Sequence, residues 1–394
     1  MKLALALLLA APAGGVGAAE PPPSSCVVAP DKQVPVTAPG REVYCGLDLG
    51  SRTAKLSVVS MEKGRFATVR DERLCKRTLG MGALVFDSRT RTAGPLPDSA
   101  IASLVDTIKE FEQVCARDGG EMVAAAATQW ARDATNIAEV SARVNAATKV
   151  RFDVLTPAQE AENGYAAGSV VTPGRLVLDA GSNSFQLAWQ EKGAPAVSSI
   201  LVRYGYVRGA ANDFEPAADY PAGWKAYQAK ARAALEQELG RLTPPMSLAR
   251  LRALVARGKV GPEIIALGDD GAVVPLAVRG LLRAGTGGWI ADSKGYDEAL
   301  LSHRLTDSSF GLMTAPPVRP AEIAAYFRGI RPADFAALKS DPVRGLYGPK
   351  ALVNPALADL LLRELGGHRL VTVPQETTTG HILTRLRRRS GGAS

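Results

Sequence analysis

Residues 43–59 read VYCGLDLGSRTAKLSVV, and residues 176–190 read LVLDAGSNSFQLAWQ. Each segment consists of an apolar run, the tetrapeptide Asp-x-Gly-Ser and a second run in which polar residues alternate with apolar ones. An apolar run, a glycine turn and an alternating run are typical of a β-hairpin. Asp179 follows Asp48 by 131 positions, about the length of one domain. The repeat therefore predicts two related units that open with the same hairpin.

The turns of these hairpins have the composition of a phosphate site. Glycine lets the backbone turn sharply and lets an anion approach closely. Backbone N–H groups and the serine hydroxyl then point into one small concavity. Asp48 and Asp179, at the strand ends, would hold Mg²⁺ directly or through water, because magnesium prefers carboxylate and phosphate oxygens. The alternative is two ordinary hairpins with polar turns.

A third segment, TPAQEAE at residues 156–162, predicts a helix that starts directly after a strand. Thr156 is a good N-cap, Pro157 suits the first helical position and Gln159 completes a capping box. Glu160 then lies at the carboxyl end of a strand, where α/β sheets bind ligands. It is a candidate general base for water, since the helix N-terminus favours the ionised form, although burial would oppose it. The alternative is a surface glutamate that stabilises the helix start.

The composition is that of a globular protein, with 46% hydrophobic and 22% charged residues, and 394 residues favour about two domains. The net charge of +8 favours an anionic partner. Aromatic residues make up only 6%, so a stacking platform for single-stranded nucleic acid is not expected, and no nucleic-acid partner is predicted. None of the three histidines lies in an H-E-x-x-H motif or beside an aspartate, which argues against a zinc protease or a His-Asp metal hydrolase.

The first residues predict export. Lys2 precedes an apolar run over residues 3–11, and small residues follow up to Ala19. This pattern predicts a cleaved signal peptide over residues 1–19, and hence a periplasmic or secreted protein. An uncleaved anchor is the alternative, but the run is shorter than the roughly 20 apolar residues that span a bilayer. No later stretch is apolar enough to span one, so no membrane contact is expected after cleavage.

Proline and polar residues dominate residues 20–41, which we interpret as a linker. We expect one domain over residues 42–172 and a second, with C-terminal helices, over residues 173–394. An even number of cysteines in an exported protein suggests disulfides, with three pairings open. Free buried thiols are the alternative. The four cysteines are Cys26, Cys45, Cys75 and Cys115.

Hydrophobic periodicity predicts an α/β protein in which strands come first and then alternate with helices. The expected strands cover residues 43–49, 54–61, 65–74, 122–127, 150–155, 175–180, 185–189, 196–202 and 263–267. The expected helices cover residues 98–117, 222–260, 320–338 and 350–366, and the second of these is interrupted at Pro244-Pro245. Two further helices are expected to begin near Asn136 and at Pro157. The basic run at residues 385–389 is expected to be a solvated end.

Taken together, four segments resemble the exopolyphosphatase / guanosine pentaphosphate phosphohydrolase family of the actin–Hsp70–sugar kinase superfamily. The family's first phosphate loop reads about D-I-G-S-N-S, and DLGSRT stands at residues 48–53. Its A-T-x-x-x-R-[DE]-A segment is similar to ATQWARDA at residues 127–134. Its S-x-x-E-E-A segment is similar to TPAQEA at residues 156–161, and its second loop, D-I-G-G-G-S, to DAGSNS at residues 179–184. Order and spacing agree from about residue 43 to 210.

The resemblance implies a two-domain actin-like (ribonuclease H-like) α/β fold with an inter-domain cleft. It also implies Mg²⁺-assisted attack of water on the terminal phosphate of inorganic polyphosphate or a guanosine polyphosphate, with Glu160 as the matching base. The secretory signal favours polyphosphate or another external phosphate ester. The family is often dimeric, which leaves a homodimer open. The residues that match the family's phosphate-binding positions are Gly50, Ser51, Arg52, Thr53, Arg132, Gly181, Ser182, Asn183 and Ser184.

Several positions depart from the family pattern. Arg52 replaces an asparagine, Lys55 stands where arginine is common, and Ser182 and Asn183 replace glycines. The later glycine-rich loop is represented only by GDDG at residues 268–271, whose aspartates would repel phosphate. These departures favour a second hypothesis, a non-catalytic exported protein that binds polyphosphate or a nucleotide. A sugar or acetate kinase of the same superfamily is a weaker third, because ATP is scarce outside the cytoplasm.

Overall fold

The structure is a computed structural model that describes residues 25–27, 40–62, 69–87, 92–170, 173–280, 315–339, 347–373 and 375–391. The predicted signal peptide and most of the predicted linker lie outside these residues. Among the described helices, none combines the length and the apolar character that crossing a membrane requires.

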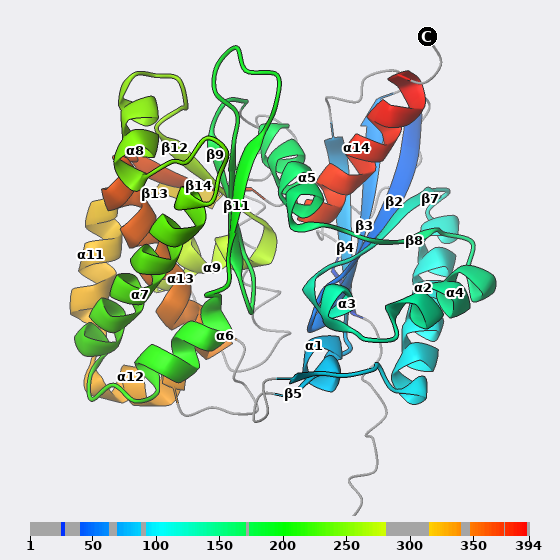
Figure 1. Ribbon diagram of the computed structural model, residues 1–394, viewed down its shortest axis with the longest axis horizontal. Coiled ribbons are helices and arrows are strands. Elements are labelled where there is room, and N and C mark those ends of the chain that lie inside the picture. The colour runs from blue at the N-terminus through cyan, green and yellow to red at the C-terminus, as the bar shows by residue number, and fades with distance from the viewer. Residues whose placement is uncertain are drawn as a thin grey trace, which may run out of the picture.

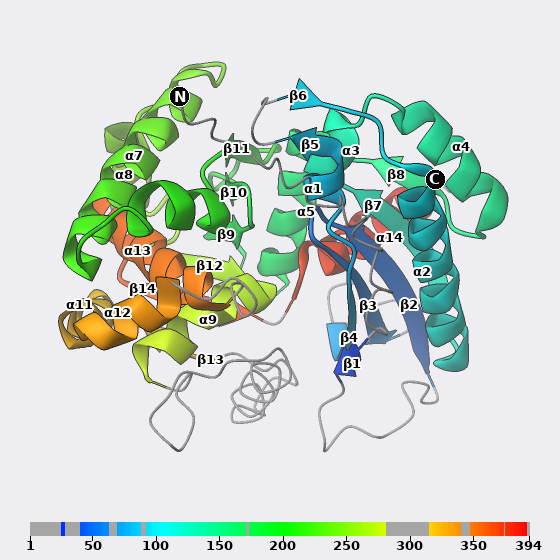
Figure 2. The same ribbon diagram turned by 90° about the horizontal axis from the view of Figure 1, so that it is seen from below.

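The chain folds into two lobes, each built on a six-stranded sheet (Figures 1 and 2). The first sheet has the order β1 (Ser25–Val27), β4 (Val69–Thr78), β3 (Thr53–Glu62), β2 (Arg41–Leu49), β7 (Glu121–Ala127) and β8 (Phe152–Val154). The second has the order β11 (Ser198–Val202), β10 (Phe185–Trp189), β9 (Leu176–Ala180), β12 (Glu263–Leu267), β14 (Arg369–Val373) and β13 (Ala315–Val318). Strands β5 (Phe86–Asp87) and β6 (Thr92–Ala93) form a small separate sheet.

The repeat in the sequence is a repeat of topology. In the first lobe β4, β3 and β2 pair antiparallel, and β7 and β8 continue the sheet in parallel. In the second lobe β11, β10 and β9 pair antiparallel, and β12 and β14 continue in parallel. The two predicted hairpins are β2–β3 and β9–β10, so they occupy the same place in each sheet.

Helices cover both faces of each sheet. In the first lobe these are α1 (Met81–Val85), α2 (Asp98–Arg117), α3 (Gln129–Asp133) and α4 (Ile137–Ala147). In the second they are α6 (Tyr206–Gly209), the π-helical turn Ala210–Phe214, α7 (Tyr220–Gly240), α8 (Leu248–Ala256), α9 (Gly268–Val278), α11 (Pro320–Gly329), α12 (Pro332–Lys339) and α13 (Tyr347–Leu365). The remaining helices, α5 (Pro157–Ser169) and α14 (Thr377–Gly391), lie side by side between the two sheets (Figure 1).

The strand and helix predictions are largely confirmed. Helix α2 has the predicted bounds, and the helical stretch at residues 222–260 is divided into α7 and α8 around Pro244-Pro245, as predicted. Strand β4 extends to Thr78, beyond the predicted end at residue 74, because its pairing with β3 continues as far as Thr53. The predicted helix at residues 320–338 is two helices, since α11 ends before Pro332 opens α12.

Helix α14 corrects two expectations. The basic run at residues 385–389 belongs to the last turns of this helix, in which residues 387–389 are exposed as expected but Leu386 is buried, and the helix packs against the first sheet rather than the second. The apolar side chains Ile382, Leu383 and Leu386 are buried against Val59 and Met61 of β3. Burying such a side chain contributes roughly 1.5–3 kcal/mol, so the apolar positions within the basic run decide its place.

Helix α5, like α14, packs on the sheet of the other lobe. It follows the first sheet in the chain, yet Ala161, Tyr165 and Ala167 pack on the second sheet against Val177 and Ile265. The two helices touch closely where they cross, because a Cβ atom added at Gly380 would lie 1.7 Å from the carbonyl oxygen of Asn163. Each lobe is therefore completed by a helix that contacts the other lobe's helix.

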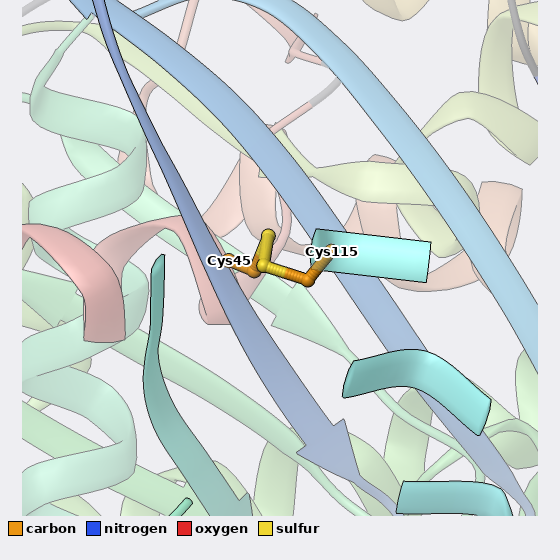
Figure 3. The surroundings of a disulfide bond; sticks show 2 residues. All are labelled: Cys45 and Cys115. Carbon is orange, nitrogen blue, oxygen red and sulfur yellow. A yellow bond between two sulfur atoms is a disulfide. The ribbon is translucent and has the colours of Figure 1, made fainter. Parts of the chain in front are cut away.

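A disulfide joins Cys45 of β2 to Cys115 of α2 and ties the first sheet to its covering helix (Figure 3). Cys75 is also disulfide-bonded, and its register partner on the neighbouring strand β1 is Cys26. No cysteine in the described part of the chain is free, so the free-thiol alternative is wrong for those residues.

Candidate functional site

The two hairpin turns have the same geometry. The backbone N–H of Gly50 donates to the carbonyl of Thr53 at 3.1 Å, and that of Gly181 donates to the carbonyl of Ser184 at 2.8 Å. A Cβ atom at Gly181 would lie 2.9 Å from the same Ser184 carbonyl, so a side chain there would push the turn open. Glycine at this position is what allows the close turn.

Each turn is held from behind by the start of a short helix. In the first lobe, the N–H of Gly82 donates to the carbonyl of Ser51 at 2.6 Å. In the second lobe, the N–H of Val207 donates to the carbonyl of Ser182 at 2.9 Å. Gly205 presses so closely on this turn that a Cβ atom there would lie 2.4 Å from the carbonyl of Gly181. The carbonyls of both turns are thus fixed by the protein itself.

Asp48 and Asp179 end the first strands of the two hairpins and interact electrostatically across the lobes. Burial, reinforced by the neighbouring carboxylates, raises the pKa of Asp48 to about 7 and that of Asp179 to about 6. Lys55 acts in the opposite direction on both pKa values. The hydroxyl of Thr377, the first residue of α14, donates to Oδ2 of Asp179 at 2.6 Å. The structure therefore brings the two turns together, with two carboxylates short of positive charge between them.

Glu160 lies on the first turn of α5, behind the predicted capping box of Thr156 and Gln159. Its Oε2 atom accepts a hydrogen bond from Nη1 of Arg132 at 3.0 Å, and both side chains are mostly buried. Burial raises the pKa of Glu160, and the ion pair with Arg132 opposes that rise. The alternative of a solvated surface glutamate is wrong, because only 13% of the side chain is exposed.

Arg132 has a role beside the phosphate binding that the resemblance implies. Its Nη1 atom also donates to the carbonyl of Leu155 at 2.6 Å, and Nη2 donates to Gln129 at 3.1 Å. The guanidinium therefore holds the carboxylate of Glu160 and the strand end before it, and its binding of a phosphate stays a prediction.

Several residues near the site were not predicted from the sequence as site residues. In the two hairpins, Lys55 is the register partner of Asp48, and Gln186 is that of Asp179. Gln186 is buried and forms a hydrogen bond with Glu160, but its Oε1 atom has no partner. Hairpin register could have identified these two positions, because each lies directly opposite a selected aspartate.

Glu376 also reaches the site, from the second lobe. Its carboxylate accepts a hydrogen bond from Nζ of Lys55 at 3.0 Å, which links the two lobes. Gly268 makes room for it, because a Cβ atom at Gly268 would lie 2.3 Å from the carboxylate, and the backbone there has φ of +56°. The sequence offered no local signal for Glu376, since it depends on a contact between distant segments.

Asp270 corrects part of the expectation that the two aspartates of residues 268–271 would repel phosphate, whereas the side chain of Asp269 lies outside what the structure describes. Its carboxylate forms an ion pair with Nζ of the buried Lys350, and its backbone carbonyl accepts from the amide of Asn354 at 2.8 Å. The same lysine lies 5.1 Å from the ring centre of Tyr206, whose pKa burial raises and Lys350 and Arg52 lower. The negative charge of Asp270 is thus neutralised within the second lobe.

The site fits a divalent cation. Asp48 and Asp179 are buried carboxylates that lack a full complement of positive charge, and the orphaned Oε1 of Gln186 offers a further oxygen. In the described ranges no three His, Cys, Asp or Glu side chains are arranged as a preformed metal cage. Magnesium is commonly held by one or two carboxylates together with water and substrate phosphates, which agrees with this donor set.

Comparisons with known proteins find similarity to a family of phosphatases. The profile of the Ppx/GppA phosphatase family matches residues 82–259. Exopolyphosphatase 1 of Mycobacterium leprae is 31% identical over 151 residues, which are 36% of this chain and 41% of that protein. The matched part thus spans about two fifths of the relative's length.

Solved structures share the fold. The Aquifex aeolicus member of the Ppx/GppA family superposes with a TM-score of 0.59 at 17% identity, over 89% of this chain and 99% of that one. An exopolyphosphatase from Cytophaga hutchinsonii superposes with a TM-score of 0.59 at 14% identity, over 88% and 98%. Residues 82–259, somewhat less than half of the chain, are therefore similar to the Ppx/GppA phosphatase family, and the chain shares the two-lobed fold of those solved structures.

Proposed function

We propose that this protein is a phosphohydrolase that releases the terminal phosphate of a phosphoanhydride chain, with Glu160 as the general base. The observation that carries the proposal is the placement of Glu160, held by Arg132, close to Asp48 and Asp179, which precede the two turns. A base, two phosphate-type turns and carboxylates for a cation are the parts that attack of water on an end phosphate requires.

In this proposal Glu160 takes a proton from the attacking water. Burial raises its pKa, and the ion pair with Arg132 opposes that rise, so the carboxylate is a stronger base than an exposed glutamate. Gln186 and Arg132 orient the carboxylate from two sides. A base held in this way contributes about 10²- to 10⁴-fold to the rate.

The two turns bind and orient the chain of phosphates. Gly50, Ser51, Arg52 and Thr53 form one, and Gly181, Ser182, Asn183 and Ser184 form the other. Since their carbonyls are bound to the starts of α1 and α6, the turns keep one shape, and this preorganisation lowers the cost of aligning the reacting phosphate. Mg²⁺, held by Asp48 and Asp179, would neutralise charge on the phosphate oxygens.

Inorganic polyphosphate is the substrate that we favour over a guanosine polyphosphate. The support is the predicted signal peptide at residues 1–19 and the disulfide between Cys45 and Cys115, because disulfides persist in oxidising compartments such as the periplasm. An exported enzyme meets little intracellular nucleotide. The name of the Mycobacterium leprae relative points the same way.

The proposal is tested by measuring phosphate release by the purified mature chain. Polyphosphate and guanosine pentaphosphate are compared side by side, each with Mg²⁺ and with EDTA. We expect Mg²⁺-dependent release, faster from polyphosphate. Faster release from guanosine pentaphosphate would overturn the substrate assignment alone. Binding of both compounds without release would reject the enzyme and favour the non-catalytic binding protein, which the serine and asparagine at positions 182 and 183 would then explain.

A further inference from the structure

A cavity of 870 Å³ lies between α5 and α14, apart from the site described above. Its walls include Tyr165 and Ser169 on α5, Thr384 on α14, and Gly193 in the turn between β10 and β11. None of the site carboxylates lines it. In Figure 1 the two helices are close at their N-terminal ends and diverge toward the top of the view, and the lining residues come from the diverging halves.

Positive charge dominates the walls of this cavity. Five basic side chains line it against two acidic ones, Glu162 and Glu191. Arg388 is 3.7 Å from Glu162, and Arg175 is paired with Glu263, so part of the charge is compensated. The basic residues are Arg175, Lys192, Lys259, Arg387 and Arg388.

Two of these side chains stand out. Lys192 and Lys259 belong to adjacent turns, since the N–H of Lys192 donates to the carbonyl of Lys259 at 2.8 Å. Both are exposed, and within the described ranges neither forms an ion pair with a carboxylate. Two lysines on adjacent turns in the wall of one concave site attract multivalent anions.

The field around the end of α14 is positive as well. A second cavity of 410 Å³ shares Arg388 with the first and is otherwise lined by four basic side chains and three apolar ones. Burial together with Arg151, Arg388 and Arg389 lowers the pKa of Arg385, and burial together with Arg388 lowers that of His381. Arg385 and Arg151 share one carboxylate, Asp153, and Arg389 pairs with Glu121, so basic side chains still outnumber the carboxylates that pair with them here.

The cavity is lined from both lobes. Arg387 and Arg388 belong to α14, which packs on the first sheet, whereas Arg175, Lys192 and Lys259 belong to the second lobe. An anion that bound all of these groups would tie the two lobes together on the side away from the catalytic carboxylates.

We propose that this cavity is a second ligand site, which binds a small anion with consecutive phosphoryl groups. Arginine forks and paired ammonium groups suit phosphate oxygens, and the volume is within the usual range of small-molecule pockets. The phosphates could come from an inorganic oligophosphate or from a nucleotide, in which case Tyr165 offers an aromatic wall.

Hydrogen–deuterium exchange of the intact chain with inorganic tripolyphosphate in EDTA tests the site without any turnover, so a catalytically inactive protein would serve equally well. We expect protection of residues 190–197, 258–261 and 384–389. The variant K192Q/K259Q should lose this protection and bind at least tenfold more weakly there, whereas the matched variant K109Q/K225Q, which removes two exposed lysines elsewhere, should behave as the parent does.

A parallel arm replaces tripolyphosphate with a nucleoside triphosphate. Equal affinity would show that the phosphates alone are recognised, and tighter binding would show that the base contacts the cavity; both outcomes support the site. Absence of protection in these three segments with either compound, or an unchanged affinity in K192Q/K259Q, would overturn the proposal, whatever the phosphate-release assays show.

Discussion

Nη1 of Arg132 lies 3.0 Å from Oε2 of Glu160, and the guanidinium is fixed in turn by the carbonyl of Leu155. The ion pair joins α3, in the first lobe, to the first turn of α5, which leads to the second lobe. Within the proposed mechanism this contact lowers the pKa of the base against the larger effect of burial, which raises it.

Replacing Arg132 with glutamine should shift the pH dependence of turnover. An opposite charge at this distance lowers the pKa of a carboxyl by about 1–3 units, so its loss raises the pKa of Glu160. Because the base must be ionised, the acid limb of kcat should move to higher pH by at least about one unit. R143Q is the control, because Arg143 also pairs with a carboxylate, that of Asp98, but on the exposed surface. An acid limb that stays in place in R132Q would show that Arg132 does not tune the base.

The crossing of α5 and α14 depends on Gly380. A Cβ atom there would lie 1.7 Å from the carbonyl oxygen of Asn163, so G380A should force the helices apart and lower the free energy of unfolding by about 3 kcal/mol or more. A Cβ atom added at Gly240, the end of α7, would meet no described atom within 4 Å. G240A should therefore change the free energy of unfolding by less than about 1 kcal/mol. Denaturant unfolding measures both, and equal effects would contradict the close crossing.

The disulfide between Cys45 and Cys115 should contribute strongly to stability. It closes a loop over a sequence separation of 70 residues, for which chain entropy alone predicts about 4 kcal/mol. We expect C45A/C115A to lower the free energy of unfolding by about that amount in denaturant titrations. Non-reducing peptide mapping should recover the Cys45–Cys115 pair and, by elimination, Cys26–Cys75. Recovery of Cys45 with any other cysteine would contradict this fold of the first lobe.

His381 should make the protein less stable in acid. It is buried in α14 with an unpartnered Nδ1, and burial, aided by Arg388, lowers its pKa to about 4. The unfolded chain then binds the proton more readily, so stability is complete above about pH 6.5 and falls as the pH drops from there to about 4. The loss is at most about 3 kcal/mol. H381Q should flatten this part of the stability curve; an unchanged slope would show that other groups cause it.

The hairpins, α2 and the capped start of α5 were predictable because each depends on local signals: periodicity, turn glycines and capping residues. Glu160, Asp48 and Asp179 stood within those local patterns. Lys55 and Gln186 needed the pairing register, and Glu376 needed a contact between segments over 300 positions apart in the chain. The place of α14 was mispredicted because its many arginines concealed Ile382, Leu383 and Leu386, whose burial outweighs the solvation of the basic positions.

The most direct measurement compares E160Q with the parent chain and with E139Q, an exposed glutamate elsewhere in the first lobe, by phosphate release from polyphosphate with Mg²⁺. Glutamine keeps the shape of the side chain but cannot accept the proton of water. The account predicts that kcat falls by about 10²- to 10⁴-fold in E160Q, with polyphosphate still bound and E139Q fully active. Full turnover in E160Q would contradict the assignment of Glu160 as the base.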